Sequence, residues 1–247
     1  MEFKFIDCMC SIGKKHVAIP GVEYSKDGVK KMLQSVNVKK AFCSHYGALS
    51  SGSFSHNRII KESIGDDDFF IPSYTFMINY AEENPCEKFE KIMIEDNVKM
   101  VNMNPSAHKF SMDIYSVSDY FDVMDKLKTV ITIPNTSVTT NQLSEILKVY
   151  KNINIIITNL GFSLNVDHDK LMKDYKNIAV DTSFTPIDGI ETVVKKFGSE
   201  RVVFSSYTPE IAPEGYAGRI ILSSLNRCDK DNIAYKNISR MVGEELI

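Results

Sequence analysis

Residues 153–181 read INIIITNLGFSLNVDHDKLMKDYKNIAVD. This stretch begins with a run of apolar, mostly β-branched residues at 155–158, continues with helical spacing of apolar residues at 167–175, and ends with a second apolar run at 178–181. A strand, a helix and a second strand within roughly 30 residues form one βαβ unit of a parallel sheet. The stretch therefore predicts a fold built from such units.

The same alternation extends along the chain in both directions. Short apolar runs predict eight strands, at 4–8, 40–44, 69–73, 100–104, 130–133, 155–158, 178–181 and 202–205. Helical patterns lie between them at 27–36, 86–96, 117–127, 141–150, 167–175 and 189–197, and Thr139 supplies a capping side chain for the fourth. Eight strands with intervening helices in 247 residues favour an α/β fold of the closed (β/α)₈ TIM-barrel type.

No GxGxxG or GxxxxGK[ST] motif follows any strand, which disfavours an open nucleotide-binding sheet. We expect one TIM-barrel domain over residues 1–247, with residues 44–65 forming a partly helical loop over the barrel mouth.

Composition narrows the class of protein. With 43% hydrophobic and 25% charged residues the chain is typical of a globular protein. The net charge of −3 provides no positive field for a nucleic acid, and no apolar run approaches the ~18 residues that span a membrane. Glu2 and Asp7 interrupt any signal-peptide core, so we expect a cytoplasmic protein whose five cysteines are reduced.

In a TIM barrel the functional side chains lie at the carboxyl ends of the strands. There this chain carries mostly neutral polar residues and two candidate catalytic groups. Asp7, after the first strand, is either a general base with a raised pKa or a hydrogen-bonded structural acid. His45, at the end of the second strand, is either an acid–base group or a structural imidazole.

Four sequence blocks resemble the amidohydrolase superfamily, specifically its amidohydrolase-2 branch. They are Ile6-Asp7, IIITNLG at 155–161, VDTS at 180–183 and FGSERVVFSSYTP at 197–209, in matching order and spacing. The block DNIAYKNISRM at 231–241 resembles the helix whose asparagine closes that family's barrel. The resemblance implies a TIM barrel in which histidines and an aspartate hold a divalent metal ion for hydrolysis or decarboxylation.

The ligand positions of that family, matched residue by residue, hold other side chains here: Met9, Ser11, Ile133, Asn159 and Tyr207, with the match at Ile133 approximate by one residue. None of these side chains is a competent ligand for a hard divalent cation. We therefore predict a degenerate member that lacks the metal site and uses no cofactor.

Without a metal, the former ligand positions are predicted to contact a small-molecule ligand. Tyr207 either donates its hydroxyl to a ligand oxygen or fills the vacated cavity with its ring, and Asn159 either orients a ligand carbonyl or bonds to a neighbouring side chain. Asp181 belongs to a strand-seven pattern with Ser183 and is either part of the site or a strand-end cap. Met9 and Ser11 complete the predicted ligand-binding set.

A zinc site made by Cys8, Cys10, Cys43 and His45 is an alternative, because Cys-x-Cys and Cys-x-His lie on neighbouring strands. Strand alternation argues against it. If Met9 and Ser11 face inward, Cys8 and Cys10 turn toward the helices.

Three functions remain open. The first is a non-catalytic barrel that binds a small molecule or a protein partner. The second is a metal-independent hydrolase, lactonase or decarboxylase that uses Asp7 and His45, with Asn159 and Tyr207 stabilising negative charge. The third is a metal-dependent hydrolase with relocated ligands. Members of the family often form homodimers, but the sequence marks no interface for one.

Overall fold

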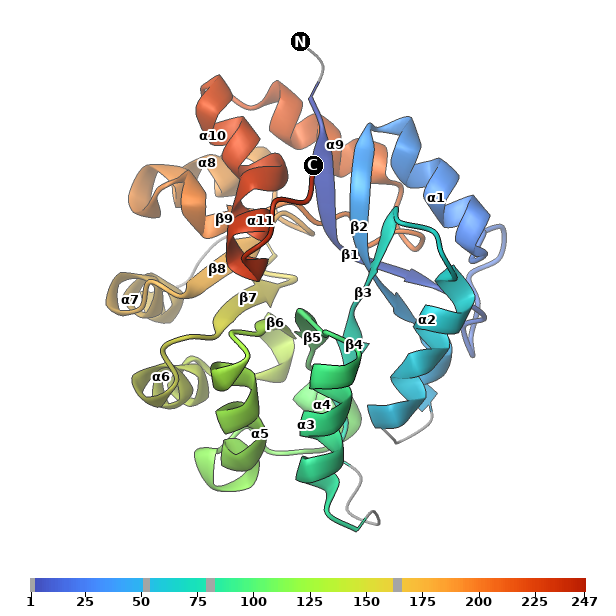
Figure 1. The fold of residues 1–247 in the computed structure, drawn as a ribbon. Helices are drawn as coiled ribbons and strands as arrows, with labels where there is room; N and C mark the ends of the chain where they lie inside the picture. Colours follow the sequence, from blue (N-terminus) through green and yellow to red (C-terminus); the bar gives the residue numbers. More distant parts are fainter. Residues whose placement is uncertain (1–2, 51–53, 79–82, 162–165) are drawn as a thin grey trace.

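The computed structural model describes residues 3–50, 54–78, 83–161 and 166–247. A central group of parallel strands is surrounded by helices (Figure 1). The strands are β1 (Phe5–Ile12), β2 (Val38–His45), β3 (Phe70–Pro72), β4 (Tyr74–Thr75), β5 (Met100–Asn102), β6 (Val130–Pro134), β7 (Asn154–Thr158), β8 (Ile178–Asp181) and β9 (Val202–Val203). All eight predicted strands are present, because β3 and β4 together occupy the third position.

Backbone hydrogen bonds join the two sheets into a closed barrel. Ser73 lies between β3 and β4, and its N–H donates to the carbonyl of Cys43 on β2 over 2.9 Å. Three residues later, the Phe76 N–H donates to the carbonyl of Asn102 on β5 over 2.8 Å. On the opposite side, the Cys8 N–H donates to Phe204, over 3.1 Å, which joins β1 to the residues that continue β9. The predicted (β/α)₈ TIM barrel is therefore confirmed.

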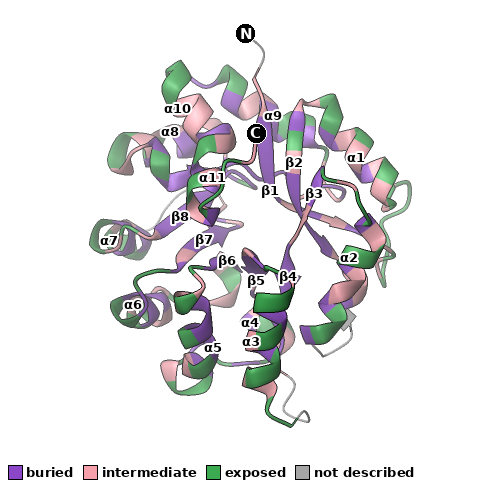
Figure 2. Cartoon of the chain, viewed as in Figure 1, coloured by how far each residue is buried: buried purple, intermediate pink, exposed green. Residues whose placement is uncertain are grey.

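The predicted helices are all present and cover the outside of the barrel, while the last helix of the chain lies across the end where the strands begin (Figure 2). They are α1 (Lys26–Ser35), α2 (Ile59–Ile64), α3 (Pro85–Glu95), α4 (Pro105–His108), α5 (Ile114–Lys126), α6 (Thr140–Val149), α7 (Val166–Asp174), α8 (Ile187–Phe197), α9 (Pro213–Leu222), α10 (Arg227–Asp231) and α11 (Asn237–Val242). Thr139 begins α6 with a reciprocal capping box to Gln142, as its sequence position predicts. Among the described helices, none is long and apolar enough to cross a bilayer.

The segment expected as a loop over the mouth, 44–65, is more helical and more tightly packed than expected. After His45 it forms a 3₁₀ turn at Tyr46–Ser50, a second at Phe54–Arg58 and then α2, while residues 51–53 lie outside the described part of the chain. Phe54 and Ile60 are buried in the main core, so burial of these apolar side chains fixes the segment against the barrel.

An apolar layer fills the amino-terminal half of the barrel. It takes residues from the strands around the barrel and is completed by two side chains of α11, namely Ile6, Cys8, Phe42, Met100, Val130, Ile156, Ala179, Val203, Ile238 and Val242. In Figure 1, α11 lies in front of the strands, at the end of the barrel where they begin. The lower barrel is therefore a packed core that leaves the carboxyl ends of the strands for function.

The orientation predicted for Cys8 is wrong. Cys8 belongs to the inner apolar layer, whereas Cys10 and Cys43 pack in the outer layer beneath the helices. The pairing of β1 with β2 shifts between Asp7 and Cys10, and such a bulge interrupts the alternation of side chains. A strict two-residue alternation therefore fails at this point of β1.

Candidate functional site

Above the apolar layer, each strand position of the barrel contributes an inner polar residue. On the other strands, alternation places the inner polar residue two positions beyond the residue that belongs to the apolar layer. On β1, where the bulge interrupts the alternation, Ser11 is the inner polar residue because its hydroxyl bonds to that of Ser44 on β2. We call them the inner polar layer: Ser11, Ser44, Ser73, Asn102, Thr132, Thr158, Asp181 and Ser205. Seven of the eight are neutral, so the upper barrel offers hydroxyl and amide groups and a single acid.

Short hydrogen bonds connect part of this layer. The hydroxyls of Ser11 and Ser44 are 2.8 Å apart. The Asn102 amide nitrogen donates to Ser73 Oγ over 2.6 Å, and its oxygen accepts from Thr132 Oγ1 over 2.6 Å. Five of the eight members are thus hydrogen-bonded to one another, which fixes the orientation of these side chains.

Asp181 is the ionisable member of the layer. Its side chain is fully buried, and one carboxylate oxygen accepts a hydrogen bond from the Ser183 hydroxyl. The Ser205 hydroxyl and the backbone N–H groups of Asn159 and Ser183 also lie close enough to favour the ionised form of Asp181 by hydrogen bonding. Burial raises the pKa of Asp181 to about 7, against the opposing effects of hydrogen bonds from Ser183, Ser205 and the Asn159 backbone.

Asp7, by contrast, is fully engaged. One of its oxygens accepts from the backbone N–H groups of Met9, over 3.0 Å, and Ser206, over 3.1 Å. The other accepts from the Ser206 hydroxyl, which also contacts Thr208. Burial raises the pKa of Asp7 to about 6 in spite of these donors. Asp7 therefore fastens β1 to the end of the eighth strand position.

His45 is held by two glycines. Its Nδ1 accepts from the Gly47 N–H over 2.9 Å, so the neutral ring carries its proton on Nε2. Its ring lies against Gly13, where a Cβ would come within 2.1 Å of Nε2. Burial, with a contribution from His56, lowers the pKa of His45. Among the described contacts none joins His45 to Asp7, so the two candidate catalytic residues are not brought together as an acid–base pair.

Three residues that follow neighbouring strands adopt the left-handed backbone conformation: Asn159, Phe184 and Tyr207, with φ of 55°, 57° and 60°. This conformation is unusual for side chains larger than glycine and is found mainly at functional positions and turns. The Tyr207 ring meets Phe184 edge-on, with centroids 5.5 Å apart. The ring of Tyr207 is thus packed against another ring at the mouth.

The match of Ile133 to a family ligand position was given within one residue, and the structure places its neighbour Thr132 inward. Ile133 itself packs in the outer layer between strands and helices. Met9, also predicted in the site, is partly exposed and contributes its N–H to Asp7.

A polar cluster at the rim was missed by the sequence patterns. Glu210 accepts hydrogen bonds from Lys15, over 2.6 Å, and from the Tyr46 hydroxyl, over 2.8 Å. Burial, and then the bond to Glu210, raises the pKa of Tyr46. Lys15 and Glu210 lie several residues beyond their strands, and only the closure of the barrel between the first and eighth strand positions brings them together.

The donor set does not fit the metal centre that the resemblance implies. The family ligand positions hold a thioether, a hydroxyl, an alkyl group, an amide and a phenol, and a hard divalent cation prefers imidazole and carboxylate. Within the described ranges, no group of three or more His, Cys, Asp or Glu side chains is placed to hold a metal ion. The four residues of the alternative zinc site diverge, with Cys8 inside the barrel and Cys10 outside it.

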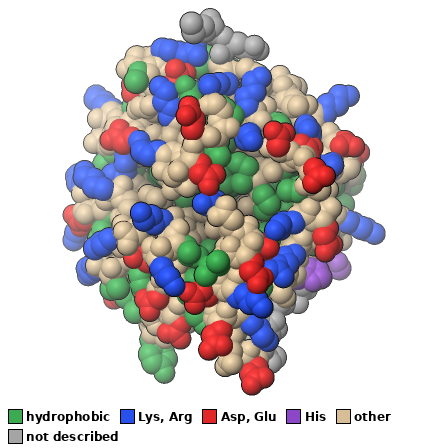
Figure 3. Space-filling model, in the orientation of Figure 1, with side chains coloured by type: hydrophobic (Ala, Val, Ile, Leu, Met, Phe, Trp, Pro, Cys, Tyr) green, Lys and Arg blue, Asp and Glu red, His purple; other side chains and the backbone are tan. Residues whose placement is uncertain are grey.

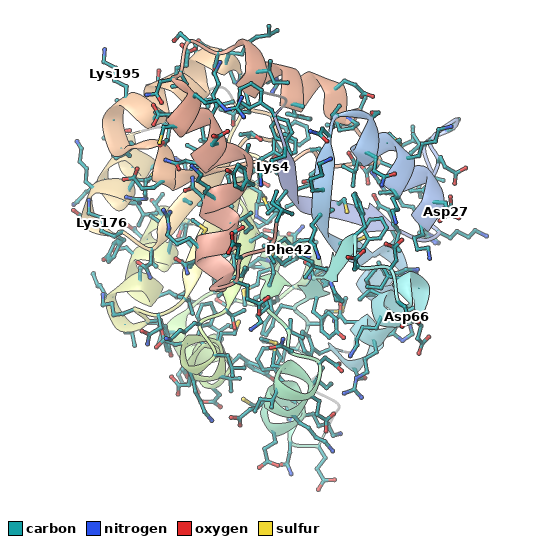
Figure 4. The ribbon with its side chains drawn as sticks, turned by 45° about the horizontal axis from the view of Figure 1, so that its top comes forward. Lys4, Asp27, Phe42, Asp66, Lys176 and Lys195 are labelled. Atoms are coloured by element: carbon teal, nitrogen blue, oxygen red, sulfur yellow. The ribbon has the colours of Figure 1, made fainter. Side chains whose placement is uncertain are left out.

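Two recorded cavities lie away from the mouth. One, of about 330 Å³, lies between the 3₁₀ turn at Phe54 and α3. The other, of about 490 Å³, lies beside α11 and includes Lys4 and Arg240. Figure 4 labels Lys4 and Phe42 near this end of the barrel, and Figure 3 shows basic and acidic side chains intermingled over the same face. This mixed-charge face has no strong bias toward a charged partner.

Comparison with known proteins identifies the fold and little else. No family model matches the chain, and no curated protein matches it. Several solved structures share the fold over nearly the whole chain. A dihydroxybenzoic acid decarboxylase from Polaromonas, with bound manganese and an inhibitor, is 11% identical with a TM-score of 0.75, covering 98% of this chain and 97% of that one.

Two further structures match at similar levels. A 4-oxalomesaconate hydratase from Rhodopseudomonas palustris is 14% identical with a TM-score of 0.71, covering 97% of this chain and 95% of that one. An amidohydrolase II protein has the same identity, 14%, and the same TM-score, 0.71, covering 98% and 100%. The chain therefore has the fold of these decarboxylase, hydratase and amidohydrolase structures.

Proposed function

We propose that this protein binds a small polar molecule in the upper half of its barrel and releases it unchanged. The observation that carries the proposal is the inner polar layer, in which hydroxyl and amide groups from around the barrel converge with a single acid, Asp181. Binding sites for small molecules are typically lined by a few fixed polar groups of this kind. Ser11 belongs to this layer, and Asn159, Tyr207 and Met9, which lies within β1, would complete the site.

The bonding of the two candidate catalytic groups supports binding rather than turnover. A general base needs a lone pair that reaches the substrate, and the Asp7 oxygens already accept three hydrogen bonds. The His45 Nδ1 lone pair is likewise occupied by Gly47. Among the described contacts, neither Asp7 nor His45 is hydrogen-bonded to a second acid or base that could relay a proton.

One observation favours a second candidate function, a metal-independent hydrolase, lactonase or decarboxylase. The pKa values of Asp7, about 6, and Asp181, about 7, lie near neutral pH, where a carboxyl group can both accept and donate a proton. The decarboxylases that share this fold make decarboxylation the first reaction to test.

The two functions are separated by what happens to a bound compound. A library of small polar molecules is screened for compounds that raise the Tm of the protein, and each binder is then incubated with the protein and followed by NMR. We expect the binders to be recovered unchanged, and Asn159→Ala and Tyr207→Phe to weaken their binding. Product formation that is abolished by His45→Ala or Asp7→Asn would replace the binding proposal with the catalytic one.

A panel of lactones, esters and aromatic carboxylic acids tests the second candidate directly. Equal background rates for the wild type and His45→Ala would remove His45 from any catalytic role. The control is Thr129→Val, which alters a buried hydroxyl next to the beginning of β6, at the opposite end of the barrel from the mouth.

A further inference from the structure

A cavity among the outer helices lies apart from the barrel mouth and takes no part in the proposed function. It has a volume of about 330 Å³ and lies between the 3₁₀ turn at Phe54–Arg58 and α3, with Met77 and Tyr120 also lining it. In Figure 1, α3 lies between α5 and the segment that leads into α2. Small-molecule sites begin at roughly 300 Å³, so this cavity is large enough for a small ligand.

The inner wall of the cavity is apolar and rich in aromatic rings. It is formed by side chains that are at most 7% exposed, namely Phe54, Met77, Phe89, Ile92 and Tyr120. The rings of Phe54 and Phe89 have centroids 4.6 Å apart, and Phe89 meets Tyr120 edge-on at 5.3 Å. A flat apolar group that enters the cavity extends this cluster of rings and gains both burial and ring contacts.

The rim of the cavity carries more positive than negative charge. The charged residues that line it are Arg58, Lys88, Lys91 and Glu95. The Glu95 carboxylate lies 2.8 Å from the Arg58 guanidinium and 3.7 Å from the Lys91 ammonium, so its charge is already compensated. Among the described residues, no ion pair includes Lys88, whose side chain is exposed. The rim therefore presents an unpaired cation beside an apolar wall.

The other acids of α3 do not cancel this charge. At 3.6 residues per turn, the residues of α3 that line the cavity fall on one face, and Cys86, Glu87 and Glu90 fall on the other. Glu87 and Glu90 act there on Cys86, whose pKa they help to raise. Glu90 is also paired with Lys126 over 2.8 Å. Lys88 is thus the cation that the cavity offers to a ligand.

We propose that this cavity binds a small amphipathic anion, a carboxylate carried on an aromatic or short aliphatic body. The apolar body lies against Phe54, Phe89 and Ile92, and the carboxylate lies at the rim beside the ammonium of Lys88. Such a ligand buries its apolar part and keeps its charge in contact with water, which avoids the cost of burying a carboxylate. A cation of the same shape meets the excess positive charge of the rim, and a neutral molecule gains no ion pair.

The test compares ligands that differ in charge and share their apolar body. Benzoate and hexanoate are titrated into the protein at pH 7, with benzamide and hexanamide as neutral matches and benzylamine and hexylamine as cationic matches. Binding is followed by NMR through the methyl groups of labelled isoleucine, with the Ile92 signal assigned by Ile92→Val. We expect the anions to shift the Ile92 signal and to bind two- to fivefold more tightly than their neutral matches, the range of an exposed ion pair.

Three variants locate the site and its charge. Lys88→Gln should remove most of the preference for the anion and leave the binding of the neutral compounds unchanged. The matched control is Lys195→Gln, an exposed lysine on α8 that belongs to no described ion pair and should behave like the wild type (Figure 4). Ser55→Phe introduces a ring from an exposed position in the lining and should weaken anionic and neutral compounds alike. Circular dichroism confirms that each variant is folded.

The outcomes separate this inference from the proposed function. An undiminished anion preference in folded Lys88→Gln overturns the inference, as does equal affinity for the three charge classes or a failure of every compound to bind. Tyr207→Phe, which alters the barrel mouth, should leave the Ile92 shifts unchanged. Benzoate binding that is lost in Tyr207→Phe and leaves Ile92 unshifted would instead place the anion in the barrel, which contradicts the inference and supports the proposed function.

Discussion

Asp7 and Asp181 show how two acids with the same burial acquire different roles. Both are fully buried, and burial raises the pKa of each. Asp7 accepts hydrogen bonds from Ser206 and the Met9 N–H, whereas Asp181 is held by Ser183, Ser205 and the Asn159 backbone. The sequence identifies both residues as acids at strand ends. Their different hydrogen bonding could not be predicted from a local pattern, because Asp7 bonds to Ser206, which lies 199 positions away in the chain.

The raised pKa values predict how stability depends on pH. In the unfolded chain an aspartate has a pKa near 3.8, so between about pH 4 and pH 7 the folded protein binds more protons than the unfolded chain at Asp7 and Asp181. The contribution of these groups to stability is therefore greatest in acid and is lost as the pH rises through their folded pKa values. For Asp181 the full effect is of the order of 4 kcal/mol.

Asp181→Asn removes this proton linkage and keeps the shape of the side chain. Relative to the wild type, the free energy of unfolding of Asp181→Asn should rise by about 4 kcal/mol between pH 4 and pH 8. Urea unfolding at several pH values measures it, with Asp169→Asn as the control carboxylate. Parallel pH profiles for wild type and Asp181→Asn would show that Asp181 is not buried as an uncompensated acid.

At the scale of elements, regular patterns were predictable and irregular ones were not. The strands and helices follow from apolar spacing and from caps such as Thr139. The bulge in β1 is invisible to such spacing, and it is what turns Cys8 inward. The rim contact of Lys15 with Glu210 likewise depends on which strands meet when the barrel closes.

The junction between α11 and the eighth strand position is a further test at this scale. Asn237, the first residue of α11, is fully buried and donates to the carbonyls of Ser199 and Val202, each over 2.7 Å. Asn237→Ala leaves both carbonyls without these donors, so we expect a loss of about 3 kcal/mol in the free energy of unfolding.

The matched control is Asn232→Ala in the π-helical turn that precedes α11. Asn232 is only partly buried and donates to the Ser199 hydroxyl over 2.9 Å, so its loss should cost about 1 kcal/mol. Chemical denaturation of both variants compares them. Equal losses at the two positions would mean that Asn237 does not anchor the closing helix.

At the scale of the whole molecule, the fold and its inner chemistry follow different constraints. The barrel depends on apolar residues distributed over its strands, which is why a single sequence predicts it and why solved structures of 10–14% identity share it. A metal site depends on a few side chains at fixed places. Replacing those few residues changes the chemistry and leaves the fold intact.

This separation leads to a prediction about metal content. If the amide, phenol, hydroxyl and thioether at Asn159, Tyr207, Ser11 and Met9 do not hold a divalent cation, the purified protein should contain zinc, iron and manganese well below one equivalent. Elemental analysis of protein prepared without chelator measures this directly. Removing a metal ion that binds only the folded state would lower the Tm. Because no such ion is expected here, dialysis against EDTA should leave the Tm unchanged. Near-stoichiometric metal with a fall in Tm after chelation would instead support a hydrolase with relocated ligands, and loss of that metal in His45→Ala would identify one of them.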